Sequence, residues 1–390
     1  MNKHKLALAS FRLKNFKAVR DSGLLKFTPL TVFIGNNGSG KSSVIEGLET
    51  YQTLVMNGLY EAMDAWSGYE HVLNKSVPHN LRYYPDAQEY HSNRIFFYCR
   101  GTDSYLKPFI VKSKINHTSN FDEVYIERED GKIDNDLIIE REYDGSYRYK
   151  NREISTQERK LDDINFSVFK ERLFDPIAKW QFLRLNPKEM GYPKPQKRTS
   201  GKVWLEKGGA NIAQYLMSIR ALSQSAFDGI IETLQFILPY AGDLQPTLTS
   251  ELERNVYLQL TESDFKVPGW LLSTGTLRLV ALLALLRHPT PPPLIVVEEI
   301  ENGLDPRSIH LLVEEIRNAV LDGTTQVILT THSPYLLDLL TLEHLVLVER
   351  DAKGQPRFFR PADNENLQRW ATKFAPGKLY TMGNLAGSGS

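Results

Sequence analysis

The chain has little cysteine and no long apolar run. Cys99 is the one cysteine in 390 residues, which excludes an internal disulfide and a cysteine-based zinc site and is typical of a reducing cytosol. The longest apolar run, Leu279 to Leu286, is far shorter than the ~20 residues of a membrane span. The first residues carry charge without the apolar stretch of a secretory leader. We therefore expect a cytoplasmic protein that makes no membrane contact.

An excess of charge of either sign is also missing. The 47 Lys and Arg residues balance the 47 Asp and Glu residues, which argues against a broad basic surface for nucleic acid, although a local patch stays open. Heptad repeats of the coiled-coil kind are absent, so we expect no long helical arms. At 41% apolar content the chain can bury a full core, either as one large domain with an insertion or as two lobes.

A glycine-rich loop follows a β-branched strand near the N-terminus. Gly35, Gly40, Lys41 and Ser42 satisfy G-x-x-x-x-G-K-[ST], the loop in which backbone N–H groups cradle phosphates, the lysine reaches the β- and γ-phosphates and the serine hydroxyl binds Mg²⁺. The helix expected from Ser43 onward would add its positive dipole end. The residues expected at the nucleotide are Asn36, Asn37, Gly38, Ser39, Gly40, Lys41, Ser42 and Ser43.

Two adjacent carboxylates end a second buried strand. Leu294 to Val297 is a continuous apolar run of the kind found in central parallel strands, and Glu298 and Glu299 follow it. Charge at the exit of a buried strand is costly without a cation or a partner. We therefore assign Glu298 to the Mg²⁺ shell, alongside Ser42, and Glu299 to polarising the attacking water in phosphoryl transfer.

Three further stretches complete a recognisable order. Ser273-Thr274-Gly275 heads an apolar helix, Gly303-Leu304-Asp305-Pro306 follows the two carboxylates, and His332 follows the strand from Val327 to Leu329. With the P-loop, this order resembles the ABC-type ATPase heads of the SMC, RecF and OLD families. Thr274 replaces a familiar signature glycine and Ile300 replaces a familiar proline.

The resemblance implies a role for each of these stretches. Ser273 and Gly275 would form a signature loop that faces the nucleotide of a second protomer. Asp305 would link the two nucleotide sites as a D-loop residue. His332 would hydrogen-bond the γ-phosphate, so that Lys41, Glu299 and His332 form the catalytic set. The implied ligands are ATP and Mg²⁺, and the implied assembly is a head-to-tail homodimer or a higher homo-oligomer.

Several alternatives stay open. Ser273 is also a plain helix N-cap and a lone histidine such as His332 is usually structural. The family's Q-loop residue would be Gln181 or Asn186. The basic loop at 191–202 either contacts phosphate or a partner, or is simply solvated. Weak candidates for base contact are Lys14, Asn15 and Phe16, which equally suit an ordinary edge strand.

The rest of the chain suggests two lobes. Short β-type runs from Arg94 to Asn151, with turn signals at Asp130-Gly131 and Asp144-Gly145, predict antiparallel hairpins. Helical spacing from Ile212 through Ile237 predicts two lid helices. The expected ranges are 1–56 for the first part of the head, 57–165 for a mixed segment and β lobe, 166–271 for a helical lid, 272–381 for the second part of the head, and 382–390 for a flexible tail.

These inferences predict an α/β fold: a P-loop ABC-type ATPase head with an antiparallel β lobe and an inserted helical lid lobe. Small heads of this kind resemble the ATPase subunits of bacterial anti-phage modules such as Septu or PARIS. That resemblance implies an ATP-hydrolysing switch that controls a separate nuclease or toxin. The alternative is a RecF-like repair ATPase that binds DNA, a partner that the zero net charge does not favour.

Overall fold

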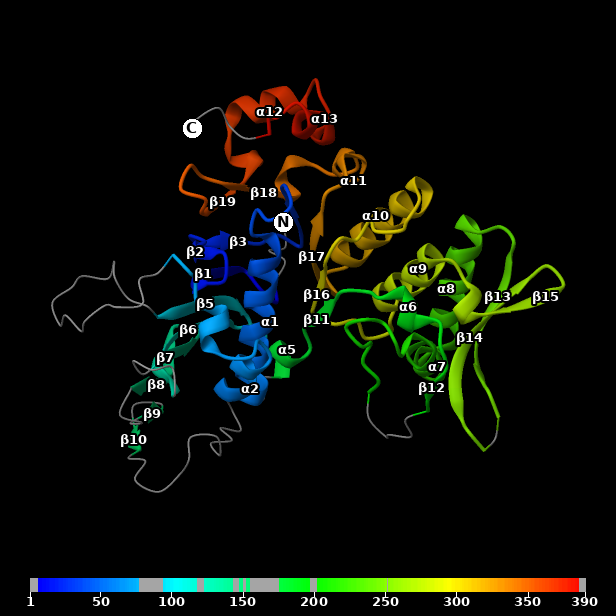
Figure 1. Cartoon of the computed structure of the whole chain (residues 1–390), viewed down its shortest axis with the longest axis horizontal. Helices are drawn as coiled ribbons and strands as arrows, with labels where there is room; N and C mark the ends of the chain where they lie inside the picture. The colour runs from blue at the N-terminus through cyan, green and yellow to red at the C-terminus, as the bar shows by residue number, and fades with distance from the viewer. Residues whose placement is uncertain are drawn as a thin grey trace. The chain divides into compact units, whose positions relative to one another are not determined.

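The computed structural model describes residues 6–76, 94–117, 123–142, 147–149, 152–154, 175–196, 202–250 and 252–385 (Figure 1). The chain forms two compact units. Unit 1 consists of Met1–Trp180 and Leu345–Asp363, and unit 2 of Gln181–His344 and Asn364–Ser390. Each unit therefore combines segments that are distant in the sequence.

A large antiparallel sheet dominates unit 1. Its strand order is β10-β9-β8-β7-β6-β5-β1-β2, with β3 paired to β1. The strands are β1 (Ser10–Phe16), β2 (Val19–Asp21), β3 (Leu25–Lys26), β5 (Ile95–Thr102), β6 (Pro108–His117), β7 (Val124–Ile133), β8 (Asp136–Glu142), β9 (Tyr147–Tyr149) and β10 (Arg152–Ile154). The predicted antiparallel lobe is confirmed, but β1 lies inside the sheet, so the edge-strand interpretation of this segment is wrong.

The position of the first predicted hairpin turn is wrong. Asp130 and Gly131 lie within β7, where the register shifts between Gly131 and Lys132 as at a β-bulge. The chain reverses at Asp134 and Asn135, which have φ of 55° and 71°, as the two central residues of a type I′ hairpin require. The other predicted turn, Asp144-Gly145, lies outside the described residues.

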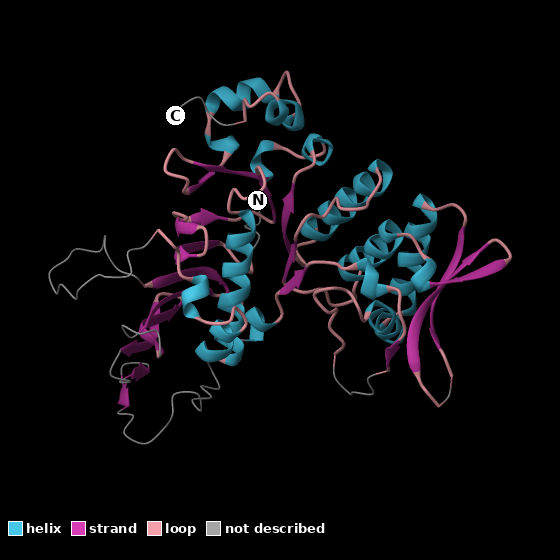
Figure 2. Ribbon diagram, in the orientation of Figure 1, coloured by secondary structure: helices cyan, strands magenta, loops and turns pink. Residues whose placement is uncertain are grey.

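Helices cover one face of this sheet (Figure 2). They are α1 (Lys41–Asn57), α2 (Leu59–Asp64) and α3 (Tyr69–Val72), and the short α5 (Asp175–Ala178) packs against α1. Tyr51 of α1 packs against Phe11 of β1 and Phe97 of β5, with ring centroids 6.2 and 5.8 Å apart. Cys99 is fully buried in the same core, and burial raises the pKa of its thiol.

A smaller group of strands in unit 1 carries the P-loop. Strand β4 (Leu30–Ile34) pairs in parallel with β18 (Leu345–Arg350), which forms an antiparallel hairpin with β19 (Pro356–Phe359). All five residues of β4 are buried, as expected of a central strand. The predicted strand, loop and helix around Lys41 are therefore confirmed.

Unit 2 contains a parallel group of three strands. These are β11 (Gln181–Leu183), β16 (Leu294–Val297) and β17 (Gln326–Thr331), with β16 paired to both neighbours. The helices α9 (Thr274–Leu286) and α10 (Pro306–Leu321) belong to the same unit. Ten of the thirteen residues of α9 are buried, which explains why its sequence is apolar on every side.

The lid segment of unit 2 is not purely helical. The predicted helices are present as α7 (Ile212–Leu222) and α8 (Gln224–Ile237), and α6 (Pro187–Met190) precedes them. The same segment also contains a sheet of β12 (Lys194–Pro195), β13 (Ala241–Leu248), β14 (Asn255–Glu262) and β15 (Phe265–Pro268). The lid is thus a mixed helix and sheet layer.

The last part of unit 2 holds α11 (Pro334–Asp338), α12 (Glu365–Ala371) and α13 (Pro376–Thr381). Of these, α12 and α13 were missed by the sequence analysis. Short 3-10 turns occur at Gly269–Leu271, Leu342–His344 and Pro361–Asp363. In the part of the chain that the structure describes, no helix has the length and apolar character to cross a bilayer.

Candidate nucleotide-binding site

The P-loop holds its own lysine in place. The Lys41 ammonium donates to the backbone carbonyls of Gly35 and Asn36 at 2.7 and 3.0 Å. Lys41 is buried at the first residue of α1, whereas Asn36, Asn37 and Gly38 are exposed at the rim of the loop. The charged group therefore lies inside the loop, where a bound phosphate would meet it.

Two glycines of this loop cannot carry a side chain. A Cβ on Gly35 would lie 2.1 Å from the backbone oxygen of Val348, and one on Gly40 would lie 2.7 Å from the Pro356 ring. Gly40 also has a φ of 114°, in the region that favours glycine. Strands β18 and β19 thus press against the loop and set its path.

Arg350 supports the loop from the same hairpin, and the sequence analysis missed it. Its guanidinium donates to the backbone oxygen of Gly38 at 2.7 Å and to that of Gly354 at 2.8 Å. Gly38 and Arg350 are 312 residues apart, so no local pattern could have revealed the contact. Arg350 links the exposed tip of the P-loop to the β18–β19 hairpin.

The donor groups present fit a triphosphate and a divalent cation. The hydroxyl of Ser39 is buried and has no hydrogen-bond partner among the residues that the structure describes, and a buried polar atom of this kind is costly unless a ligand or water satisfies it. Ser42 is exposed at the start of α1, where its hydroxyl could ligate Mg²⁺. Magnesium usually takes only one or two protein oxygens and completes its shell with water and substrate phosphates.

The two carboxylates after β16 have different surroundings. Glu298 is half-buried and its N–H donates to the Leu183 carbonyl at 3.1 Å. Glu299 is exposed, has a φ of 49°, and donates its N–H to the Thr330 hydroxyl at 2.9 Å. Its carboxylate accepts from the Asn302 amide at 2.5 Å. The left-handed backbone of Glu299, which costs about 1–2 kcal/mol in an L-residue, redirects its side chain relative to Glu298.

Glu301 and His332 form a second contact in unit 2. The backbone N–H of His332 donates to one Glu301 carboxylate oxygen at 2.6 Å, and the other oxygen is buried without a hydrogen-bond partner in the described part of the chain. His332 itself is half-buried directly after β17. Glu301 therefore holds the loop that carries the histidine.

The signature and D-loop stretches pack against each other. A Cβ on Gly275 would lie 2.4 Å from the backbone oxygen of Gly303, so only glycine fits this contact. The Ser273 hydroxyl accepts from the Thr276 N–H at 3.0 Å, which makes it the N-cap of α9. Arg278, missed by the sequence analysis, donates to the Leu185 carbonyl at 3.0 Å. Burial lowers the pKa of Arg278, whereas the nearby charge of Glu299 raises it.

Asp305 has the contacts of a helix cap. Its carboxylate accepts from the N–H groups of Arg307 and Ser308 at 2.9 and 3.2 Å, and from the Ser308 hydroxyl at 2.5 Å. The hydroxyl of Ser308, followed by the two N–H groups, lowers the pKa of Asp305 against a weaker effect of burial. Within one protomer, Asp305 fixes the start of α10.

The open alternatives differ in where they lie. Gln181 begins β11 and donates to the Leu205 carbonyl at 2.8 Å, whereas Asn186 follows the carboxyl end of β11. Leu183 of β11 pairs with Val297 of β16 in parallel. Asn186 therefore follows the same carboxyl end of the sheet as Glu298 and Glu299. Residues 197–201 of the basic loop lie outside the described residues.

The three residues of β1 that were candidates for contact with the nucleotide base make contacts within the protein. Phe16 is fully buried against Phe97, with ring centroids 6.1 Å apart. Asn15 donates to the Arg94 carbonyl at 2.9 Å, and Lys14 lies 3.7 Å from the Asp21 carboxylate. Phe16 is therefore a core residue, and the hypothesis that it contacts a base is wrong.

The comparisons with known proteins agree with this geometry. A family model described as "AAA domain, putative AbiEii toxin, Type IV TA system" matches residues 30–338, which is well over half of the chain and includes every motif from the P-loop to His332. The chain belongs to this AAA family. An ATP/GTP phosphatase of Helicobacter pylori is 21% identical over 358 residues, covering 90% of this chain and 91% of its own length.

The fold of this AAA protein is that of an SMC-type head. A crystal structure of an Smc head bound to the C-winged helix domain of ScpA matches it with a TM-score of 0.55 and 13% identity. The match covers 90% of this chain and 96% of the Smc head chain. The predicted α/β ATPase-head fold is confirmed, and the family membership supports nucleotide binding and an ATPase-like function.

Proposed function

We propose that this AAA protein is a Mg²⁺-dependent ATPase that dimerises head-to-tail around ATP and acts as a switch for a separate effector. The observation that carries the nucleotide-binding part is the P-loop, in which two loop carbonyls hold Lys41 and the buried Ser39 hydroxyl meets no partner among the described residues. Mg²⁺ bound by Ser42 and Glu298 would neutralise charge on the phosphates as the γ-phosphoryl group leaves.

The remaining roles follow from the second half of the chain. Glu299 orients and deprotonates the attacking water, and Asn302 holds its carboxylate in position. His332 donates to the γ-phosphate from a loop fixed by Glu301. In the dimer, Ser273 and Gly275 of one protomer face the nucleotide of the other, where the positive end of α9 favours the phosphate charge.

A protein partner is supported by three observations. The Smc head that shares this fold is bound to a domain of another protein, and the matching family description refers to a toxin system. Trp270 and Leu271 are 43% and 68% exposed beside the signature loop, and large exposed apolar side chains of this kind often mark protein contacts. We infer that the effector is a nuclease or toxin and that the setting is defence against phage.

Steady-state ATP turnover tests the catalytic assignment. Glu299→Gln should lower kcat about 100-fold or more, the usual effect of losing a general base, while leaving ATP affinity within a few-fold. Lys41→Ala should instead abolish ATP binding, because the phosphate charge loses its buried cation. Measurement of kcat by phosphate release and of affinity by a fluorescent ATP analogue separates the two outcomes.

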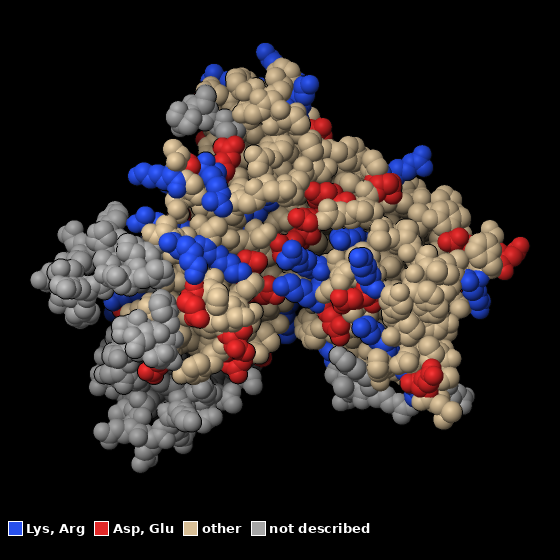
Figure 3. Space-filling view, viewed as in Figure 1, with Lys and Arg blue, Asp and Glu red and all other residues tan. Residues whose placement is uncertain are grey.

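The same assay compares the switch with the RecF-like alternative. Basic and acidic side chains are interspersed on the face shown in Figure 3, so we expect duplex DNA to leave turnover unchanged at 50 and 200 mM salt. A several-fold rise with duplex at low salt would favour a DNA-loading ATPase. Full turnover in the Glu299→Gln variant would refute the assignment of Glu299 as the general base. The charge-matched control for this variant is Glu343→Gln.

A further inference from the structure

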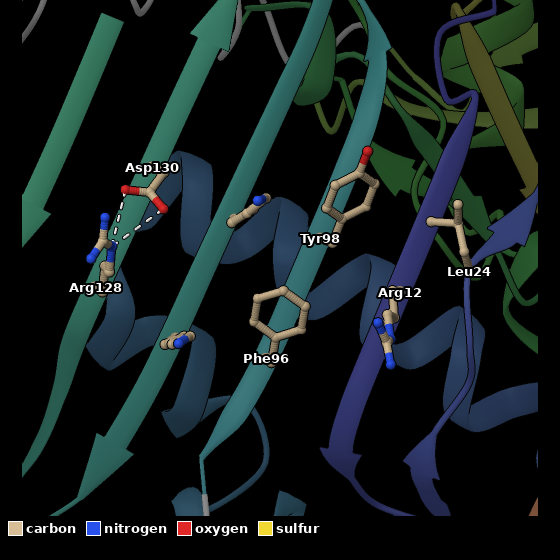
Figure 4. Close-up of a pocket in the computed structure, with 8 residues that line it drawn as sticks. Arg12, Leu24, Phe96, Tyr98, Arg128 and Asp130 are labelled. Carbon is tan, nitrogen blue, oxygen red and sulfur yellow. Dashed lines mark hydrogen bonds and ion pairs between the residues drawn. The ribbon is translucent and has the colours of Figure 1, made fainter. Parts of the chain in front are cut away.

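The open face of the large sheet in unit 1 carries an aromatic and basic surface. Phe96 and Tyr98 of β5 stand on this face beside Arg12 of β1, and Arg128 of β7 lies beyond the intervening strand β6 (Figure 4). They line a hollow of about 510 Å³ together with Leu24, Lys112, Lys114 and Asp130. None of these residues belongs to the nucleotide site.

The strand register arranges these side chains in two rows. Tyr98 pairs with Arg12 on one side and with Lys112 on the other. In the next row, Phe96 pairs with Lys14 and Lys114 in the same way. Because directly opposite residues share a face of the sheet, each ring is flanked on both sides by a cation.

Two of the cations form no ion pair with any of the described residues. Arg12 is paired with Asp21 at 2.7 Å, and Arg128 with Glu140 at 2.9 Å. Lys112 and Lys114 of β6, in contrast, have no hydrogen-bond or ion-pair partner in the described part of the chain. On the β7 side Lys114 faces Arg128, whereas Lys112 faces Asp130, which is itself paired with Arg128 at 3.2 Å. Both lysines lie directly beside half-exposed rings, where they can meet an anion.

We propose that this face, named here the β5–β6 platform and defined by Arg12, Phe96, Tyr98, Lys112 and Lys114, binds single-stranded nucleic acid. Bases would stack on Phe96 and Tyr98, and the lysines would contact the flanking phosphates. Aromatic rings within a positively charged groove are the usual means of binding single strands without sequence preference.

The spacing of the platform suits a single strand better than a duplex. Phe96 and Tyr98 are two residues apart on one strand, so their rings stand about 7 Å apart along it. Neighbouring bases of an extended strand can each reach one ring, whereas the bases of a duplex are stacked on one another and cannot. A local cluster of cations of this kind can bind nucleic acid even though the net charge of the whole chain is zero.

Fluorescence anisotropy with the full chain tests this proposal. The probes are labelled dT12 and U12 oligonucleotides and a 12-base-pair duplex, each at 50 and 200 mM salt. We expect the single strands to bind at least tenfold tighter than the duplex, and the two single strands separate a DNA partner from an RNA partner. Tyr98→Ala should weaken binding about tenfold or more, the usual effect of losing one stacked base.

The lysines have a separate readout. Lys112→Ala with Lys114→Ala should lower the slope of log affinity against log salt by about 1.4, because each phosphate contact on a single strand contributes about 0.7. Phe265→Ala and Lys266→Ala are matched controls, since both are exposed residues of β15 in unit 2. ATP turnover, which does not depend on the platform, reports whether each variant is folded.

Two results would overturn the proposal. One is equal affinity for the duplex and the single strands, which would indicate a purely electrostatic surface. The other is unchanged single-strand binding in folded Tyr98→Ala and double-lysine variants. Neither result bears on Glu299 or Lys41, so failure here is distinguishable from failure of the proposed ATPase.

Discussion

At the scale of single residues, Asp305 makes a prediction about pH. Its pKa lies below the ordinary value of 3.8, chiefly because of the Ser308 hydroxyl. The ionised carboxylate therefore stabilises the folded state at pH values above about 4, and this contribution is lost as the pH falls through the folded-state pKa. Asp305→Ala should lower the free energy of unfolding by about 1 kcal/mol at pH 7.

Urea unfolding at pH 7 and pH 3 measures this effect. The difference between wild type and Asp305→Ala should shrink at pH 3, because this pH lies below the ordinary carboxyl pKa of 3.8 and closer to the lowered pKa of the folded state. Asp305→Asn is the control, because asparagine also caps helices. A difference that is the same at both pH values would show that the charge of Asp305 does not contribute.

The residue scale also shows what the sequence could reveal. The loop from Gly35 to Ser42 was predicted in full because its chemistry is local. The left-handed backbone of Glu299 and its contact with Asn302 have no sequence signature. Arg350 could not be assigned either, because its partner Gly38 is reached only through the pairing of β4 with β18.

At the scale of elements, the contact between Gly275 and Gly303 makes a second prediction. A methyl group on Gly275 would lie 2.4 Å from a backbone oxygen, so α9 and the D-loop would have to move apart. We expect Gly275→Ala to lower the free energy of unfolding by about 1–3 kcal/mol, the typical cost of overpacking. Urea denaturation followed by circular dichroism measures this loss.

Gly208→Ala is the matched control in the same unit. Its Cβ would meet its nearest neighbours at 3.8 and 3.9 Å, which is ordinary van der Waals contact. This substitution should change stability by less than about 0.5 kcal/mol, as surface changes usually do. Equal effects of the two substitutions would mean that the two loops are free to separate.

Elements were predicted where periodicity was strong. The lid helices follow from their apolar spacing and α9 from its continuous apolar run, whereas β13 contains Pro246, which is unusual within a strand. The alternation of Val256, Leu258 and Leu260 in β14 is a strand signal that was available. The turn predicted at Asp130-Gly131 was wrong for a physical reason. These two residues lie next to a β-bulge within β7, and the chain does not reverse there.

At the scale of the whole molecule, head-to-tail dimerisation predicts complementation between two inactive variants. Lys41→Ala lacks the P-loop cation, and Ser273→Asp keeps a helix cap but places a negative charge where the partner's phosphate would lie. Each variant alone should be inactive. An equal mixture should regain about a quarter of wild-type turnover, because half of the dimers are mixed and each mixed dimer has one intact site.

Phosphate release by the mixture, measured across a range of protein concentrations, tests this arrangement. Activity should rise with the concentration of both variants and disappear when either is omitted. A mixture of Lys41→Ala with Lys41→Ala/Ser273→Asp is the control, because no intact site can form. No recovery in the first mixture would contradict a shared site, even if wild-type turnover is normal.

The burial of Cys99 has a practical consequence for labelling the protein with dyes. Its thiol is fully buried beside Tyr51 and its pKa is raised, so little of the reactive thiolate forms at neutral pH. Maleimide dyes should therefore leave the native protein almost unlabelled. Cysteines introduced at exposed positions, one in each unit, could then carry a donor and an acceptor dye for single-molecule distance measurements without first removing the natural thiol.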